Sequence, residues 1–332
     1  MNFNRLLITG ATGFIGRHLI TKLSLRKLIP NIRILVRESS NKKLISEYEK
    51  LIPGLEVVIG NLGNKESLDE ALKDCDCLIN LAACVTYKNI PDLYKINVLG
   101  VEKLCKSAIK YELKRFIQIS STASLGYSRD INDILDENAE FGLVGKGYNY
   151  AESKYLGDKK VLEYYKKEGL QGIICLPSEV YGEYGWETAK NLVDFLKFPV
   201  CWDGGTSVVY VKDVADGIIK ALFNGVAGEK YILGSENLTI YQIVEYVLRF
   251  CDQNKKTTKI PNFIVNYPIN FISNIQFKLG LEPLFDPDVI KYATKYWFVD
   301  STKARESLNF KPSSNQIIFS KTINWLKENN LI

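Results

Sequence analysis

The chain has 332 residues, of which 46% are hydrophobic and 24% are charged, and its formal net charge is +5. This composition is typical of a globular protein with room for one large domain and a smaller one, and it excludes an intrinsically disordered chain. Lysine and arginine are spread along the sequence without a long basic run, so we expect no nucleic-acid partner.

The chain contains seven cysteines and a single histidine, His18. These residues indicate whether a metal site is expected and in which cellular compartment the protein occurs. The cysteines are scattered through apolar segments and no second histidine is present, so we expect no metal site. Scattered thiols are typical of a reducing compartment, and the first apolar run begins almost at Met1, which leaves no room for a signal peptide. We therefore expect a cytoplasmic protein.

In chain order, the first predicted strand covers residues 6–8 and the first predicted helix covers residues 14–25. The turn between them carries Gly10, Gly13 and Gly16 at three-residue spacing. A tight turn, a close approach of backbone to a pyrophosphate, and a helix packed hard on its strand each favour a residue without a Cβ. The helix N-terminus adds free N–H groups for phosphates. The spacing has one more residue than the standard dinucleotide fingerprint, so it predicts a variant of that turn, with an incidental glycine-rich turn as the alternative.

The second predicted strand, residues 32–36, is followed directly by Arg37. An acidic residue at this point typically holds the ribose 2′-hydroxyl of NAD, whereas an arginine suits the 2′-phosphate of NADP. Arg37 therefore predicts NADP as the cofactor. The neighbouring Glu38 keeps NAD open, and a solvent-facing strand end is the alternative interpretation of Arg37.

Further strand-length apolar runs alternate with amphipathic stretches. The runs cover residues 55–60, 75–81, 115–120 and 171–176, and the amphipathic stretches include 67–73 and 94–111. This alternation predicts a parallel sheet with helices on both faces, which is a Rossmann-type doubly wound α/β fold.

The pattern loosens after Pro177, where aromatic residues, proline and asparagine become more frequent. We expect residues 1–177 to form the dinucleotide-binding domain, with 207–233 returning to it. Residues 178–206 and 234–332 would form a smaller substrate-binding α/β region over the carboxyl ends of the strands, where open α/β sheets bind ligands.

A long apolar stretch, FIVNYPINFISNIQFKLG, begins at Phe263. Pro268, asparagines and Gln276 interrupt it, so we predict no transmembrane segment. A buried helix, or an apolar lid over a pocket, is the expected structure.

A hydroxyl-rich segment, SSTAS from Ser120, is followed by YNYAESK, which ends at Lys154. Residues four apart share one face of a helix, so Tyr150 and Lys154 can point to the same place. Tyr155 and Lys159 have the same spacing but are rotated by about 140° on an ideal helix. An ammonium group beside a phenol lowers the pKa of the phenol, and a hydroxyl from a strand end can hold a substrate oxygen next to it. Tyr150 and Lys154 are therefore the predicted chemical pair.

These motifs, with NLAA at 80–83, YKINVLG at 94–100 and LPSEVYG at 176–182, resemble the extended short-chain dehydrogenase/reductase family, also called the NAD-dependent epimerase/dehydratase family. The segments VVYVKDVADGIIKAL, GEKYILGSENLTI and YWFVDSTKARESLNFKP are similar to its bacterial branch of dihydroflavonol 4-reductase-like proteins and hopanoid-associated sugar epimerases. The resemblance implies an NAD(P)-dependent enzyme. It also implies a homodimer built from the long helices near 94–111 and 149–167.

The resemblance assigns roles to individual positions. For catalysis it implies Tyr150 as the general acid/base, Lys154 as the residue that tunes it and contacts the nicotinamide ribose, and Thr122 as the catalytic Ser/Thr, with Ser121 as the alternative. The implied cofactor contacts are Gly10, Thr12, Gly13, Phe14, Ile15 and Gly16 at the pyrophosphate, Asn61 and Leu62 near the adenine, Leu81, Ala82 and Ala83 beside the cofactor, and Pro177, Ser178 and Val180 around the nicotinamide amide.

Two positions depart from the family's pattern. Asn61 stands where the family usually has an aspartate near the adenine, and it can still form a hydrogen bond but carries no charge. Leu176 stands where the family usually has an arginine, so whatever that arginine orients must be held otherwise or not at all.

Three functions stay open from the sequence. The first is an NADP-dependent oxidoreductase that acts on a carbonyl or secondary alcohol of a small molecule. The second is a nucleotide-sugar epimerase or dehydratase, which is disfavoured because Thr206 and Ser207 stand where many such enzymes carry an arginine for the nucleotide phosphates. The third is a dinucleotide sensor without activity, which the set of Thr122, Tyr150 and Lys154 disfavours.

The segment after the fourth predicted strand contains Cys84, Thr86 and Tyr87. These residues either line a substrate pocket or form a simple loop.

Overall fold

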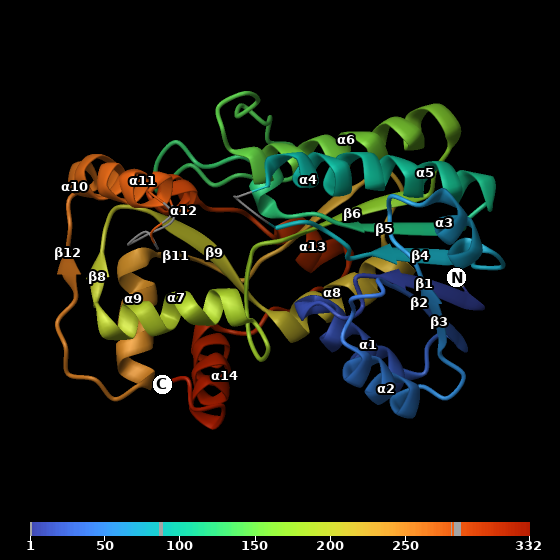
Figure 1. Cartoon of the computed structure of the whole chain (residues 1–332), viewed down its shortest axis with the longest axis horizontal. Coiled ribbons are helices and arrows are strands. Elements are labelled where there is room, and N and C mark those ends of the chain that lie inside the picture. The colour runs from blue at the N-terminus through green and yellow to red at the C-terminus, as the bar shows by residue number, and fades with distance from the viewer. Residues whose placement is uncertain (1, 86–88, 280, 282–286) are drawn as a thin grey trace.

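The structure, a computed structural model, describes residues 2–85, 89–279, 281 and 287–332. Its larger part is a sheet of seven parallel strands in the order β10-β6-β5-β4-β1-β2-β3 (Figure 1). The strands are β1 (Arg5–Thr9), β2 (Asn31–Val36), β3 (Glu56–Ile59), β4 (Cys77–Asn80), β5 (Arg115–Ile119), β6 (Gly172–Pro177) and β10 (Lys230–Leu233). The strand order reverses between β1 and β4, as in the predicted Rossmann-type doubly wound fold.

The apolar runs form strands because helices cover both of their faces, and every residue of β4, β5 and β6 is buried. The prediction for β4 began two residues early, at residue 75. The strand starts at Cys77 because the Cys75 amide instead closes the turn after the preceding helix, donating to the Leu72 carbonyl at 3.0 Å.

Helices form one layer on each face of the large sheet. One hydrophobic core lies under α1 (Phe14–Arg26), α2 (Lys42–Leu51) and α8 (Val211–Asn224). The other lies under α3 (Lys65–Leu72), α5 (Val101–Lys110) and α6 (Asn149–Glu168). Between α4 (Ile90–Tyr94) and α5 the chain makes a π-helical turn over Lys95–Gly100, so the predicted amphipathic stretch 94–111 is helical but not a uniform α-helix.

The smaller part of the molecule contains a second sheet. Its strands are β7 (Glu179–Tyr181), β9 (Gly205–Tyr210), β11 (Glu236–Thr239) and β13 (Tyr296–Trp297), with β8 (Val200–Cys201) paired to β12 (Thr258–Lys259). The helices α7 (Trp186–Lys197), α9 (Ile240–Phe250) and α14 (Asn315–Glu328) pack beside it around their own apolar core. A short helix, α13 (Thr302–Ser307), packs under the large sheet.

The chain returns from the smaller part to the large sheet through α8 and β10. Residues 207–210, which we expected to return with them, belong to β9 of the smaller sheet, because their backbone pairs with β7 on one side and β11 on the other.

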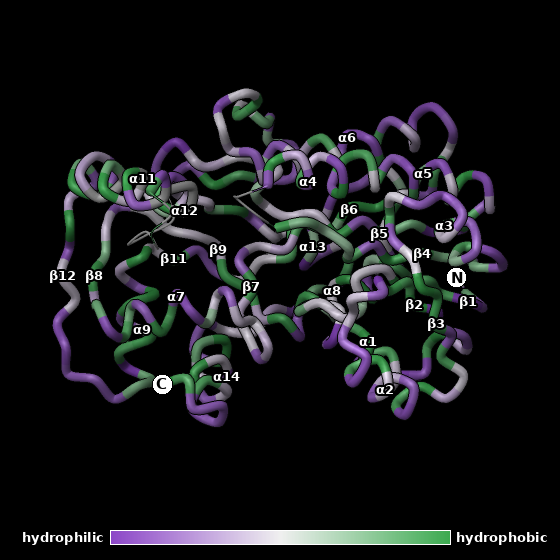
Figure 2. Tube along the Cα trace, viewed as in Figure 1, coloured by the Kyte–Doolittle hydropathy of each residue, from purple (hydrophilic) through white to green (hydrophobic). Residues whose placement is uncertain are grey.

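The apolar stretch from Phe263 is helical. It forms α10 (Asn262–Ile264), a π-helical turn (Val265–Ile269) and α11 (Asn270–Lys278), and α12 (Pro287–Ala293) follows. Phe263, Tyr267 and Phe271 are exposed, so the expectation of a buried helix is wrong. Figure 2 shows hydrophobic residues recurring along this outer corner of the molecule. Gly280, the last residue of the stretch, lies outside the described residues, and none of the described helices is long and apolar enough to cross a bilayer.

Candidate active site

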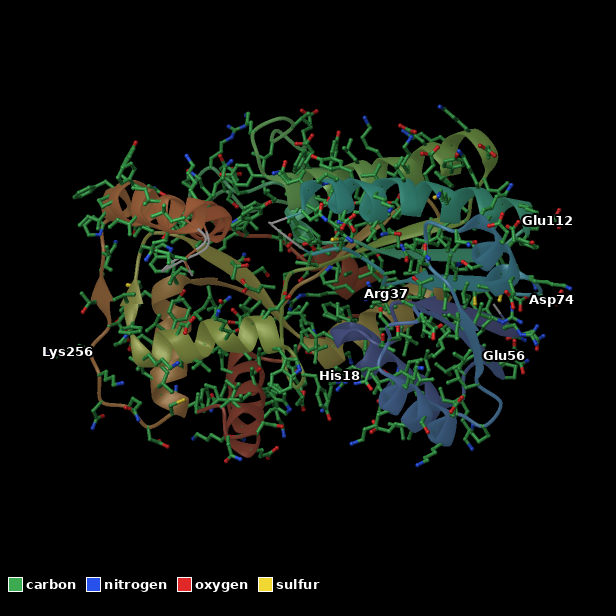
Figure 3. The ribbon with its side chains drawn as sticks, viewed as in Figure 1. His18, Arg37, Glu56, Asp74, Glu112 and Lys256 are labelled. Atoms are coloured by element: carbon green, nitrogen blue, oxygen red, sulfur yellow. The ribbon has the colours of Figure 1, made fainter. Side chains whose placement is uncertain are left out.

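The candidate site lies at the carboxyl edge of the large sheet, around the switch point between β1 and β4. Figure 3 places Arg37, just past the end of β2, toward the middle of the molecule, where the smaller part begins. Glu56, Asp74 and Glu112 mark the opposite, amino edge of the same sheet. The chain segments that follow the strands therefore meet the smaller part at this edge.

A ladder of buried side-chain hydrogen bonds fixes the strand ends at this edge. Thr9 Oγ1 donates to Asn80 Oδ1, and Asn80 Nδ2 donates to Gln118 Oε1 at 2.8 Å, so the ladder crosses β1, β4 and β5. The sequence analysis did not single out this ladder. Its signal is one polar residue in each of three otherwise apolar strands, because a buried polar group needs a partner.

The turn after β1 depends on two of its glycines for close packing. Gly10 has φ +69°, and a Cβ there would lie 2.6 Å from the Ala82 nitrogen. A Cβ on Gly16 would collide with the carbonyl oxygens of Gly10 and Ala11. A Cβ on Gly13 would meet only the Gly10 oxygen, at 3.2 Å, so the backbone at Gly13 stays open to a ligand.

Helix α1 begins beside this open backbone. Its N-cap is Gly13, no side chain caps it, and no acidic residue stands in its first turn. Its first N–H groups and the positive end of its dipole are therefore available to an anion. Thr12, Phe14 and Ile15 are half-buried around the turn, and Tyr48 Oη anchors it by donating to the Ala11 carbonyl at 3.0 Å.

Arg37 is exposed directly after β2, and its amide donates to Ser40 Oγ at 3.0 Å. In the part of the chain that the structure describes, no carboxylate pairs with its guanidinium. Burial raises the pKa of the Cys84 thiol, and the Arg37 charge acts in the opposite direction, so Arg37 is close enough to act on the segment that follows β4.

Asn61 and Leu62 follow β3. The Asn61 Oδ1 accepts from the Gly63 amide at 2.8 Å, so this side chain shapes its own turn. Leu62 is buried in the core under α5. The departure from aspartate at position 61 thus leaves a residue with a local structural partner.

The segment after β4 is held from two sides. The Ala82 amide donates to Thr9 Oγ1 at 3.3 Å, beside the half-buried Leu81, and Ala83 is exposed. Asn97, from the π-helical turn, accepts from the Cys84 amide at 2.8 Å and donates to the Cys84 carbonyl at 2.9 Å. Thr86 and Tyr87 lie outside the described residues.

Tyr150 stands in the first turn of α6, and the Ser121 side chain is close enough to its phenol to act on the pKa of that phenol. Ser121 caps a short 3-10 helix that follows β5, where its Oγ accepts from the Ala123 amide at 3.2 Å. Thr122, which the resemblance favours for catalysis, is the first residue of that helix and is buried. The structure therefore brings the alternative residue, Ser121, close to the phenol.

Lys154 lies one turn after Tyr150 and is almost fully buried. Its Nζ donates to the Ile119 carbonyl at 2.8 Å, and burial lowers the pKa of this ammonium to about 8. Asp158 lies one further turn along α6, four residues after Lys154. It is buried, and its carboxylate accepts a hydrogen bond from Ser120 Oγ at 2.7 Å.

Burial raises the pKa of the Asp158 carboxyl to about 6, and its negative charge in turn raises the pKa of Lys154. Asp158 is not among the site residues predicted from the sequence. Positions 150, 154 and 158 share one helix face, and a third polar residue at four-residue spacing is the signal that could have found it.

The pKa of Tyr150 differs from the expectation. Burial raises the pKa of the phenol to about 12, and the Ser121 side chain opposes this only in part. We expected Lys154 to lower this pKa, but its ammonium donates to the Ile119 carbonyl instead. At neutral pH the phenol is therefore protonated and can serve as a proton donor.

The second Tyr–Lys pair faces elsewhere, as its rotation on the helix predicts. The Tyr155 ring stacks on Phe141 with centroids 4.5 Å apart, and Lys159 lies over the Tyr155 ring. Neither residue approaches the hydroxyls that follow β5.

The segment after β6 brings a hydroxyl without a partner to the site. Pro177 ends β6, Val180 lies half-buried in β7, and Ser178 between them is buried. The Ser178 Oγ has no hydrogen-bond partner among the described residues. This hydroxyl is closed off beside Gly234, so a ligand atom would reach it only if the neighbouring groups moved.

The smaller part closes over the same edge. A Cβ on Gly185 would collide with the Phe14 ring at the start of α1. The Glu187 carboxylate, in the first turn of α7, is close enough to raise the pKa of Tyr150. The start of α7 therefore lies across the site from the start of α6.

Known proteins share the sequence pattern and the fold of this chain. A model of the NAD dependent epimerase/dehydratase family matches residues 6–234. A putative dihydroflavonol 4-reductase of Synechocystis is 25% identical in an alignment that covers 98% of this chain and 95% of that protein. The crystal structure of gox2253 has a TM-score of 0.82 at 28% identity and covers 98% of both chains. DesIV, a dTDP-glucose 4,6-dehydratase from Streptomyces venezuelae with NAD bound, shares the fold with a TM-score of 0.76 at 20% identity, and 98% of both chains is covered.

Proposed function

The chain belongs to the NAD-dependent epimerase/dehydratase family, and from that premise we propose that it is an NADP-dependent oxidoreductase. It would transfer hydride between the nicotinamide and a carbonyl or secondary alcohol carbon of a small molecule. The observation that carries this proposal is the placement of Ser121 near the Tyr150 phenol, one helical turn before the buried Lys154, at the carboxyl edge of the sheet that also carries the glycine turn. The similarity to a putative dihydroflavonol 4-reductase supports the same hypothesis of an oxidoreductase.

The residues of the site fit a nicotinamide dinucleotide, which supplies or accepts the hydride when bound. The open backbone at Gly13 and the uncapped start of α1 would take the pyrophosphate. Arg37 would fork onto a 2′-phosphate, which is the basis for NADP over NAD. Pro177, Ser178 and Val180, at the end of β6 and in β7, would lie around the nicotinamide amide, as the family resemblance implies.

The chain's own residues handle the proton. Tyr150 is protonated at neutral pH, so it would donate its proton to a carbonyl oxygen as that oxygen gains charge. Ser121 would hold the same oxygen, with Thr122 as the alternative. In the reverse direction Tyr150 would have to act as a base, and the Ser121 side chain, which lowers the pKa of the phenol, would favour its phenolate.

The smaller sheet argues against a nucleotide-sugar substrate. Burial raises the pKa of the Glu179 carboxyl group in β7, and Thr206, in β9, is close enough to oppose this in part. A carboxyl group at this point offers no attraction to a nucleotide diphosphate, which would need a cation to bind. A carbonyl or alcohol without a diphosphate suits these residues better.

The test is a substrate screen that follows NADPH absorbance, with nucleotide sugars and hydrophobic carbonyl compounds assayed side by side. Net oxidation of NADPH by a carbonyl compound supports the proposal. Conversion of a nucleotide sugar without net change in the cofactor would identify an epimerase or dehydratase instead. The Tyr150→Phe variant is the matched control, because it removes the proton donor and keeps the ring.

We also propose that the protein is a homodimer built from α5 and α6, which lie side by side on the outside of the large sheet (Figure 1). Leu99, at the start of this surface, is 53% exposed, as an interface residue would be in a separated subunit. Light scattering at micromolar concentration should give a dimer, and Leu99→Asp should shift it toward monomer. A monomeric parent protein would contradict the proposal.

A further inference from the structure

An exposed apolar stripe runs along α10, the π-helical turn and α11. Its members stand at four-residue spacing, and their exposed fractions lie between 41% and 74%. They are Phe263, Tyr267, Phe271, Ile275 and Leu279. Figure 1 shows α10 and α11 at the corner of the molecule farthest from the N-terminus. Single exposed apolar residues are ordinary, but a continuous stripe with aromatic side chains indicates a surface that binds something.

The stripe is not the side by which this segment packs on the protein. Val265 and Ser273 are buried on another side of the same helical segment. Asn262 is tied to Asp203 by two hydrogen bonds, of 2.8 and 2.9 Å, and Asn266 accepts from Thr294 at 3.1 Å. The segment is therefore anchored to the smaller part with its apolar stripe turned outward.

The segment that carries the stripe contains lysines as its only charged residues. Residues 253–281 contain four lysines and no aspartate or glutamate, and the acidic residues Asp252 and Glu282 flank this range. Lys259 is paired with Asp203, whereas Lys255, Lys256 and Lys278 are exposed and have no carboxylate partner in the described parts of the chain. Figure 3 shows Lys256 at the same end of the molecule as α10 and α11, but below them, on the loop that precedes β12.

We propose that this stripe docks on an anionic lipid bilayer, lying in the plane of the headgroup region without crossing it. A helix with an apolar face inserts its side chains at the boundary between headgroups and acyl chains, and nearby lysines are attracted to anionic lipids. The complementary charge decides between occupants. A second copy of this surface would bring like charges together, whereas an anionic bilayer takes both the apolar stripe and its lysines.

The experiment is co-sedimentation of the full chain with two kinds of vesicle. One is phosphatidylcholine alone, and the other is an equal mixture of phosphatidylcholine and phosphatidylserine. The protein should sediment with the mixed vesicles and much less with phosphatidylcholine alone, and binding should weaken as salt rises. The measurement needs no substrate, so its outcome is independent of the proposed function.

Two double variants test the stripe and its charges separately. Tyr267→Ser with Phe271→Ser should bind the mixed vesicles at least about tenfold more weakly, because two large apolar side chains are lost. Lys256→Glu with Lys278→Glu should lose the preference for phosphatidylserine. The matched control, Leu25→Ser with Val226→Ser, removes two exposed apolar side chains outside the stripe and should bind normally.

Circular dichroism and thermal unfolding of each variant would show that it is folded. The proposal is overturned if the parent protein does not sediment with the mixed vesicles, or if the Leu25/Val226 control loses binding as much as the stripe variant. It is also overturned if light scattering shows that the stripe variant dissociates an oligomer while no vesicle binding occurs, because a second copy would then be the occupant.

Discussion

The carboxyl edge of the large sheet and the α10–α11 corner both depart from the ordinary distribution of side chains, in opposite directions. At the edge, charged and polar groups such as Lys154 and Asp158 are buried and joined by hydrogen bonds. At the corner, large apolar groups such as Tyr267 and Phe271 are exposed. Each arrangement lowers the stability of the fold, and such departures are concentrated at functional sites.

The difference between these regions is one of geometric precision. A buried ladder such as Thr9–Asn80–Gln118 tolerates little displacement, because each of its buried polar side chains is bound to its neighbour in the ladder. Binding through an apolar stripe depends only on how much apolar area is exposed and on the direction in which the side chains point. We therefore expect substitutions at the edge to change catalytic rate and cofactor choice, and substitutions at the corner to change association.

The strongest test of the edge is Tyr150→Phe. This substitution keeps the ring and its packing but removes the proton, so kcat should fall by about 10²–10⁴-fold while folding and NADPH binding remain. Steady-state kinetics with the substrate found in the screen would measure it. Tyr155→Phe is the control, because its ring stacks on Phe141. Normal turnover by Tyr150→Phe would mean that the edge is not the chemical site.

The next test separates two neighbouring hydroxyls. Ser121→Ala should lower kcat by about 10²–10³-fold, because Ser121 is the hydroxyl that lies near the Tyr150 phenol and would hold the substrate oxygen. Thr122→Val, which keeps the shape of a buried side chain, should have a smaller effect. If Thr122→Val lowered kcat more than Ser121→Ala, Thr122 would be the residue that holds the substrate oxygen.

Cofactor choice tests the outer part of the edge. Arg37→Ala should weaken NADP(H) binding by about 10–100-fold through loss of charge-assisted hydrogen bonds, and leave NAD(H) binding nearly unchanged. Titration of cofactor fluorescence would measure both. Lys50→Ala, at the far end of α2, is the matched loss of one exposed charge and should change neither affinity. Equal losses for both cofactors in Arg37→Ala would refute the assignment.

The smallest expected effect concerns Asp158, a positioning residue that acts through Lys154. Its negative charge raises the pKa of Lys154, so Asp158→Asn should lower that pKa and make Lys154 lose its proton at lower pH. The alkaline limb of the kcat/KM profile should therefore move to lower pH, by up to about one unit. Asp158→Glu keeps the negative charge, so the alkaline limb of its kcat/KM profile should lie at the same pH as in the parent protein. An unchanged profile with only lower thermal stability would indicate a purely structural role.

Much of the edge could be predicted from the sequence because its signals are local. The glycine turn, the strand that precedes it and the helix that follows it lie within residues 5–26, and period and turn chemistry determine them over a few residues. The same holds for Tyr150 and Lys154, whose four-residue spacing fixes a common helix face wherever the helix lies.

Tertiary structure decided what depends on how distant segments meet. Choosing Ser121 over Thr122 as the neighbour of Tyr150 requires the register between the end of β5 and the start of α6, which a run of hydroxyl residues does not encode. The exposure of Phe271 depends on which side of its helix the smaller part anchors, since an apolar pattern is the same for a buried face and a docking face. The raised pKa of Tyr150 depends on burial and on the Lys154 bond to the Ile119 carbonyl, and both arise only when α6 packs on the sheet.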